Sequence, residues 1–463
     1  MSSHTRPSQP GIRLHVDLDG ELRPHRSAKI EAHLRVDVDA DGAPTDLPAV
    51  ELAVIIAVDV AEPNRAAVRH ALPAALRALP DRISFAVLGG GPEPVRCYPL
   101  GDDEWAVADQ NQRRRAAFAT GSLPLHRDGP RPAGYAPWAA GARALLAGRP
   151  LSVRHLVLIT DGSSSAGETR LEEELDACAG QFTCDVFAVG ADWTPDPLLT
   201  LAERLHGTAQ FVDEGLGRAV TDAIARLRRV RTSQLPIEVT LRPSVRQVSL
   251  SEKAPRPHRL VGLPRPGRPH CWSFPTHQWE QGSRDYLLTL VANADDDPLE
   301  TELQFAMVSV NGVHEPVVAR WHLPGQSEPP TPTAGGGSVR SMNATARMRG
   351  ALREGLTALQ EHRPGTAREC LAQAAQLAAR FGTDWVLDEI RTVADIEDAD
   401  AGRIRLRAVD AGALGPMILR AGSHPGAPMA GAVDAPPGPR CGTCGNRAGS
   451  EARYCIVCGE KLL

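Results

Sequence analysis

The sequence predicts an α/β protein whose main domain is a doubly wound, mostly parallel β-sheet. Residues 52–58 form an uninterrupted apolar run that ends at Asp59, and a similar run over 156–160 ends at Asp161. Strands that are apolar on both faces are typical of parallel sheets covered by helices. Ligands of such sheets bind at the carboxyl ends of the strands. We therefore expect Asp59 and Asp161 to meet at one edge of the sheet.

Strands and helices alternate throughout residues 49–230, which we assign to this α/β domain. The expected strands are 52–58, 83–88, 156–160, 185–189 and 210–212, and the expected helices are 64–79, 137–146, 171–178, 197–205 and 216–230. Repeated strand–helix units of this length favour a parallel sheet with helices on both faces.

The flanking segments show the two-residue alternation of half-buried antiparallel strands. Residues 1–48 contain two such strands, and residues 235–325 contain several more, separated by prolines. Two strands alone rarely hold together in water, so we expect both segments to form one antiparallel β-sandwich. The α/β domain would then be an insertion in that sandwich. The alternative is two separate small sheets.

The remainder of the chain divides by composition into three parts. Residues 339–410 show apolar positions at helical spacing and are expected to form a helical hairpin, which needs a neighbouring domain to pack against. Residues 411–438 are rich in Gly, Ala and Pro and are expected to be a flexible linker. Residues 439–463 carry a cluster of cysteines.

Charge and hydropathy limit the classes of partner. The net charge is −5, and general nucleic-acid affinity depends on a basic surface, so nucleic-acid binding is not favoured. No apolar run reaches the roughly 18–20 residues that span a bilayer, and the first residues lack the apolar core of a signal peptide. We expect a cytoplasmic protein with no membrane segment.

Residues 49–230 resemble a von Willebrand factor type A (VWA) domain, on the strand pattern and the Thr-Asp-Gly sequence that begins at Thr160. Members of that family often carry a metal-ion-dependent adhesion site (MIDAS) of Asp-x-Ser-x-Ser, a threonine and an aspartate. The resemblance implies a site for a hard cation such as Mg²⁺, which prefers oxygen ligands. Bacterial cytoplasmic members commonly act as protein-binding scaffolds, including beside AAA+ ATPases or in signalling gene clusters.

This sequence keeps only part of the MIDAS pattern. Asp59 and Asp161 match the two acids, but Ala61 and Pro63 stand at the serine positions and Tyr135 stands where the threonine would be. Most of the direct coordination is therefore missing. One interpretation is a degenerate MIDAS kept for shape, whose rim of Asp59, Tyr135 and Asp161 recognises a protein partner. The other is a weak Mg²⁺ site on the two acids.

The cysteines near the end of the chain predict a structural zinc site. They form two Cys-x-x-Cys-Gly sequences, separated by residues 445–454: Cys441, Cys444, Cys455 and Cys458. Four thiolates around Zn²⁺ make a closed tetrahedral site with no open position for catalysis. The segment resembles a zinc ribbon, and a segment this short depends on the metal for its folding energy. Two disulfides are the alternative.

Three functions follow from these features. The first is a non-enzymatic scaffold or adaptor that binds protein partners, such as an AAA+ ATPase or signalling proteins, through the VWA rim, with the zinc ribbon as a second contact. The second is a Mg²⁺-dependent ligand-binding subunit that regulates an ATPase-driven complex. The third is nucleic-acid binding through the zinc ribbon. The sequence offers no catalytic constellation that supports an enzyme.

Overall fold

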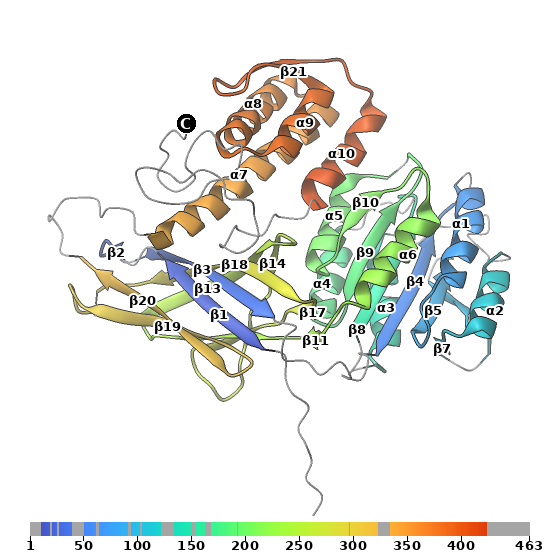
Figure 1. Ribbon diagram of the computed structural model, residues 1–463, viewed down its shortest axis with the longest axis horizontal. Helices are drawn as coiled ribbons and strands as arrows, with labels where there is room; N and C mark the ends of the chain where they lie inside the picture. The colour runs from blue at the N-terminus through green and yellow to red at the C-terminus, as the bar shows by residue number, and fades with distance from the viewer. Residues whose placement is uncertain are drawn as a thin grey trace, which may run out of the picture. The chain divides into compact units, whose positions relative to one another are not determined.

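A computed structural model describes most of the chain between residues 11 and 423 (Figure 1). The described ranges are 11–18, 21–25, 27–38, 51–61, 64–90, 94–101, 104–121, 134–149, 153–162, 168–191, 193–295, 297–322 and 334–423. The chain divides into two units, which are described separately. The first unit contains Val38–Leu235 and Pro275–Gly282, and the second contains Ile12–Asp37, Pro236–Phe274 and the chain from Ser283 onward.

The first unit is built around strand β4 (Leu52–Asp59), in which every side chain is buried. Its sheet is 7-stranded, with the order β10-β9-β8-β4-β5-β6 and with β7 also paired to β5. The remaining strands are β5 (Ser84–Gly89), β6 (Val95–Tyr98), β7 (Ala106–Val107), β8 (Val153–Thr160), β9 (Thr183–Ala188) and β10 (Ala209–Phe211). The strands from β10 to β5 are parallel. The prediction of a mostly parallel α/β sheet is confirmed.

Six helices cover the two faces of this sheet. Their bounds are α1 (Arg65–Arg77), α2 (Gln110–Gly121), α3 (Ala136–Leu146), α4 (Glu168–Cys178), α5 (Pro195–Arg204) and α6 (Leu216–Leu227). Helices α1, α2 and α6 pack together over the core formed by the even-numbered side chains of β4. Helices α3, α4 and α5 form the other group. The apolar runs are therefore long and unbroken because helices bury both faces.

Two antiparallel strands and a helix at one edge of the sheet were not predicted. Strands β6 and β7 both pair antiparallel with β5, and helix α2 packs on β6 and α1. Helix α2 has the sequence QNQRRRAAFATG, in which only three small side chains are buried. Because this segment has no strong apolar stripe, its sequence is typical of a polar loop. The helix is recognised from its packing against α1 in the structure.

The two larger sheets of the second unit are mainly antiparallel, although the short strand β2 pairs parallel with β20. The 5-stranded sheet has the order β1-β3-β18-β13-β14, and the 6-stranded sheet has the order β15-β16-β12-β19-β20-β2. The strands are β1 (Ile12–Leu18), β2 (Glu21–Leu22), β3 (Ala28–Val38), β12 (Ile237–Leu241), β13 (Val245–Ala254), β14 (His258–Leu260), β15 (Leu263–Pro264), β16 (Cys271–Phe274), β18 (Gly282–Ala292), β19 (Glu302–Val310) and β20 (Val313–Trp321). Amino-terminal strands therefore join each sheet: β3 lies beside β18, and β2 beside β20.

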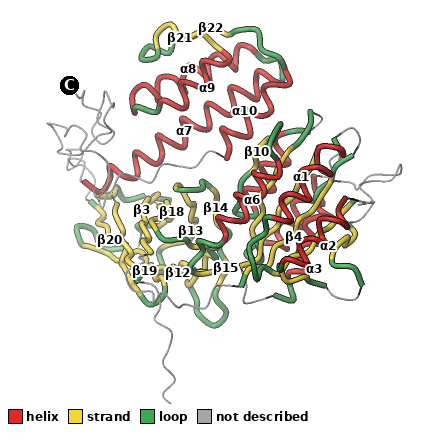
Figure 2. The backbone as a smooth tube through the Cα atoms, turned by 45° about the vertical axis from the view of Figure 1, so that its right-hand side comes forward, coloured by secondary structure: helices red, strands yellow, loops and turns green. Residues whose placement is uncertain are grey.

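A helical group completes the described part of the second unit (Figure 2). It consists of α7 (Ala334–Gln360), α8 (Pro364–Phe381), α9 (Asp384–Val393), the hairpin β21 (Ala394–Asp398) with β22 (Arg403–Leu406), and α10 (Ala411–Ser423). Helix α7 packs along α8, where Gly355 permits a close approach to Leu371. Helix α8 ends at Phe381 and is capped by Gly382, whose positive φ of 66° suits glycine.

The first part of the predicted linker, which was expected over residues 411–438, is helical in the structure. Residues 411–423 form helix α10, which packs on α7. Leu414, Met417, Ile418 and Ala421 are buried, and their spacing places them on one helical face. The Gly, Ala and Pro content of this stretch hides that periodicity. The rest of the predicted linker lies outside the described residues.

No helix in the described ranges has both the length and the apolar character needed to cross a bilayer.

Candidate functional site

The parallel pairing of β4 and β8 brings the two predicted acids to the same edge of the sheet. Asp59, the last residue of β4, is in register with Thr160, the last residue of β8. Asp161 follows directly, and its backbone N–H donates a hydrogen bond to the carbonyl oxygen of Asp59 at 3.1 Å. The backbone pairing of β4 and β8 therefore brings these two acids to one edge, as expected from the sequence.

The carboxylate of Asp59 is completely buried and is bound by the neighbouring strand. The hydroxyl of Thr160 donates to Asp59 Oδ2 at 3.0 Å. The backbone N–H of Gly162 in turn donates to Thr160 Oγ1 at 3.1 Å. A buried carboxylate without such donors would be strongly destabilising, so this chain of hydrogen bonds stabilises Asp59 in its position.

The carboxylate of Asp161 accepts hydrogen bonds from the loop that follows β4. The backbone N–H of Ala61 donates to Asp161 Oδ2 at 2.8 Å, and Asn64 Nδ2 lies 3.5 Å from the same oxygen. Ala61 occupies one serine position of the MIDAS pattern, and it contributes a backbone donor where that pattern has a hydroxyl. Pro63, at the other serine position, lies outside the described residues.

Tyr135 lies immediately before helix α3 and is buried against the same edge. Burial raises the pKa of its phenol well above the ordinary value, a hydrogen bond with Thr160 opposes this rise, and the negative charges of Asp59 and Asp161 add to it. The phenol therefore remains protonated at neutral pH and can act as a hydrogen-bond donor. Its proximity to both acids shows that the structure brings all three predicted residues together.

Trp193 covers the loop after β8 and was not predicted from the sequence. Gly162 has a φ of +77°, and a Cβ at this position would lie 2.0 Å from Cβ of Trp193. The indole Nε1 donates to the carbonyl oxygen of Gly190 at 3.0 Å, and the indole ring contacts Phe211 with centroids 5.5 Å apart. The indole contacts anchor Trp193 on the β9–β10 side, and the backbone and Cβ of Trp193 lie against Gly162.

The resulting arrangement is an internal hydrogen-bonded network. Asp59, Tyr135 and Asp161 are respectively 0%, 4% and 2% exposed, so these side chains shape the edge from below its surface. Within the described residues, no group of three or more His, Cys, Asp or Glu side chains is arranged to hold a metal. The four predicted zinc ligands, Cys441, Cys444, Cys455 and Cys458, lie outside the described residues.

Comparisons with known proteins agree with this fold. Residues 52–211 match the sequence model of the von Willebrand factor type A domain family. Two solved structures resemble the chain over most of its length. A von Willebrand factor type A protein from Catenulispora acidiphila is 21% identical, with a TM-score of 0.76, covering 91% of this chain and 98% of that one. The ArnB paralog VWA2 from Sulfolobus acidocaldarius is 8% identical, with a TM-score of 0.51, covering 89% and 98% respectively. No curated protein sequence matches the chain.

Proposed function

We propose that the VWA domain at residues 52–211 makes this chain a non-enzymatic scaffold or adaptor, which binds protein partners without requiring a metal. VWA domains generally mediate protein interactions. The proposal that no metal is needed is based on the hydrogen bonds that both carboxylates already accept from the chain. Thr160 donates to Asp59, and the Ala61 backbone donates to Asp161.

A hard cation would have to compete with these donors. Mg²⁺ binds through oxygen ligands in near-octahedral geometry and gives up its waters reluctantly. At this edge Ala61 supplies no side-chain oxygen, and Tyr135 stands at the sequence position where the MIDAS pattern has its threonine. The hydrogen bonds satisfy the buried carboxylates in place of a cation, so we propose a degenerate MIDAS whose role is to hold the surrounding loops in a shape that the partner recognises.

The remaining parts of the chain would position this surface. We propose that the antiparallel strands on either side of the VWA domain form one β-sandwich, with the VWA domain inserted between β3 and β12. The pairing of β3 with β18 and of β2 with β20 supports this arrangement. The helical group from α7 to α10 would extend the scaffold.

The cysteine-rich tail would provide a second contact. We propose that Cys441, Cys444, Cys455 and Cys458 bind one structural Zn²⁺ as a zinc ribbon. Their Cys-x-x-Cys spacing supports this assignment, and a bacterial cytoplasmic location suits four reduced thiolates. The partners would be proteins such as an AAA+ ATPase or signalling proteins.

The metal-independent role is tested by calorimetric titration of the full chain with Mg²⁺. The wild type should show no binding at millimolar concentrations. The triple variant Ala61→Ser, Pro63→Ser and Tyr135→Thr restores the hydroxyl ligands of the MIDAS pattern and should gain binding. Sub-millimolar binding by the wild type that disappears in Asp59→Ala would overturn the proposal and favour the Mg²⁺-dependent regulatory subunit.

The interaction role is tested by quantitative co-purification from the native host, with and without EDTA. We expect the same partner to remain bound in EDTA and to be lost in Asp161→Ala, whose fold is checked by its thermal transition. Asp222→Ala, an exposed acid on α6, is the matched control.

A chain ending at Ser423 keeps α10 and removes the cysteine-rich tail. Partner loss in this truncation alone would assign the interaction to the zinc ribbon. Salt-sensitive DNA or RNA binding by the full chain that is lost in the truncation would favour the nucleic-acid alternative.

A further inference from the structure

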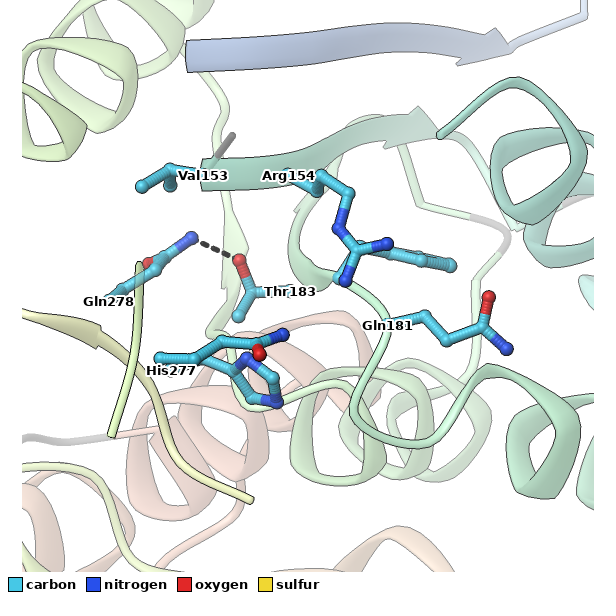
Figure 3. Close-up of a pocket in the computed structure, with 8 residues that line it drawn as sticks. Val153, Arg154, Gln181, Thr183, His277 and Gln278 are labelled. Carbon is cyan, nitrogen blue, oxygen red and sulfur yellow. Dashed lines mark hydrogen bonds between the residues drawn. The ribbon is translucent and has the colours of Figure 1, made fainter. Parts of the chain in front are cut away.

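A polar pocket lies at the amino ends of β8 and β9, at the edge of the sheet opposite to Asp59 and Asp161 (Figure 3). One wall is the two-stranded ribbon of β11 (Thr232–Gln234) and β17 (His277–Trp279), and all lining residues belong to the first unit. The space between its lining residues amounts to about 200 Å³, a figure that includes solvent at the open mouth of the pocket. Its lining residues are Val153, Arg154, Gln181, Phe182, Thr183, Gln234, His277 and Gln278.

Arg154 supplies a positive charge to this pocket. Figure 3 shows its guanidinium directed into the space beside Gln181 and Thr183. The side chain is partly buried, and burial lowers its pKa, with no carboxylate contributing to the shift. Among the described residues, no acid forms an ion pair with Arg154. Within the described residues the guanidinium therefore has no carboxylate partner, and its charge is available to an anionic ligand.

The wall opposite Arg154 is held in place by hydrogen bonds. The side-chain amide of Gln278 donates to the hydroxyl of Thr183, and His155 Nδ1 lies 2.7 Å from the same hydroxyl oxygen. His155 is itself buried, with Nε2 3.5 Å from Asp185 Oδ2. These contacts fix the polar groups of the pocket before any ligand arrives, which reduces the entropy cost of binding.

We propose that this pocket binds a small oxyanion, such as inorganic phosphate or a carboxylate group, with Arg154 as its principal ligand. The planar guanidinium presents paired N–H donors that match both phosphate and carboxylate oxygens. The amide and hydroxyl side chains around it can hydrogen-bond the remaining oxygens. The space between the lining residues suits a single such group better than a nucleotide.

An oxyanion in this pocket would contact both the parallel sheet and the β11–β17 ribbon. Strand β11 leads directly to β12 of the second unit, and β17 lies in the chain between β16 and β18 of that unit. The ribbon therefore adjoins three of the places where the chain passes between the units, at residues 235–236, 274–275 and 282–283. An oxyanion bound to Arg154 on β8 and to Gln278 on β17 would tie this ribbon to the parallel sheet. This inference does not depend on the proposed scaffold function.

The test is calorimetric titration of the full chain with sodium phosphate at constant ionic strength, with chloride as the balancing anion. We expect saturable binding by the wild type, at least tenfold weaker binding by Arg154→Gln, and intermediate binding by Arg154→Lys. Arg218→Gln removes an exposed arginine from α6 and should bind as the wild type does. Gln181→Glu places a negative charge in the pocket while leaving Arg154 intact, and it should abolish binding.

Parallel titrations with sulfate and acetate distinguish the sources of the oxyanion. Stronger binding of phosphate and sulfate would indicate a free inorganic anion, and stronger binding of acetate would indicate a carboxylate. Hydrogen exchange of peptides covering β11 and β17 should slow on saturation in the wild type and stay unchanged in Arg154→Gln. Equal binding by the wild type and Arg154→Gln, or no binding of any of the three anions at 50 mM (about ten times a Kd of 5 mM), would overturn the proposal.

Discussion

Asp285, on β18, is the most informative side chain at which to perturb the second unit. It is completely buried and accepts hydrogen bonds from two side chains of β3. His33 Nε2 lies 2.8 Å from Oδ1, while Arg35 donates through Nε to Oδ1 at 3.0 Å and through Nη2 to Oδ2 at 3.2 Å. The network joins residues that are about 250 positions apart in the chain. Asp285→Asn keeps the shape of the side chain and removes its charge.

The expected cost follows from the burial and the geometry. The side-chain NH₂ of asparagine, itself a donor, would face a donor of either His33 or Arg35. The guanidinium of Arg35 would also lose its counter-ion. Removing one partner of a buried ion pair typically costs about 3–5 kcal/mol. Since a factor of ten in an equilibrium corresponds to about 1.4 kcal/mol, local opening of β3 and β18 should become roughly 150- to 4,000-fold more frequent.

Hydrogen exchange measured by mass spectrometry is the appropriate assay, because a chain with two units does not unfold in a single step. Peptides covering Ala28–Val38 and Gly282–Ala292 should exchange faster in Asp285→Asn, while peptides covering β4 and β8 of the first unit should not change. Glu302→Gln is the matched control. Its ion pair with Arg320 is exposed and should be worth at most about 1 kcal/mol.

The same network predicts a dependence on pH. Burial would raise the pKa of Asp285, but the hydrogen bonds and charges of His33 and Arg35 outweigh it and hold that pKa below the ordinary value of 3.8. A lowered folded-state pKa stabilises the protein above the ordinary value, and this stability is lost as the pH falls through the folded value. The wild type and Asp285→Asn should therefore differ fully at pH 7 and progressively less below about pH 4. Exchange in Asp285→Asn no faster than in Glu302→Gln would refute the reasoning.

Three further predictions concern other parts of the chain. Gly162→Ala should lower the thermal transition of the α/β domain by several degrees, because the new methyl group would overlap Trp193 and the positive φ disfavours alanine. An unchanged transition would contradict the described turn. Cys178 should resist iodoacetamide in the native protein at pH 8, since burial and the charge of Glu174 raise its pKa to about 12. Alkylation should increase as the pH rises toward that value. Rapid modification at pH 8 would contradict the burial of this thiol. The full chain should contain one zinc per molecule by elemental analysis and lose it in Cys444→Ser, whereas zinc retained by that variant would exclude the proposed site.

The buried strands could be predicted because their signal is local. The apolar run that ends at Asp59 is typical of a strand buried on both faces of a parallel sheet, and β8 repeats the pattern before Asp161. Because the carboxyl ends of parallel strands lie at the same edge of a sheet, the acids at the ends of those strands are predicted to lie together. Tyr135 was found from the resemblance to the VWA family, since its position depends on the fold and no local pattern marks it.

The missed features depend on contacts between distant segments. Helix α2 has a weak apolar face and is stabilised by its contact with α1. Trp193 is an isolated aromatic residue in a loop, and its contact with Gly162 joins two different strand ends. The burial of Asp59 and Asp161 also could not be read from the sequence, because it depends on side chains such as Tyr135 that pack over the edge.

The pairing of β3 with β18 has a consequence for the order of events during synthesis. Strand β3 ends at Val38 and its neighbour β18 begins at Gly282, so the ribosome must add more than 240 residues before the pair can form. At about 5–20 residues per second this takes roughly 12–50 s. The α/β segment between them is complete in the chain by then and has time to fold first. During that interval the alternating apolar side chains of β1 and β3 lack β18 as a neighbour and stay exposed to solvent.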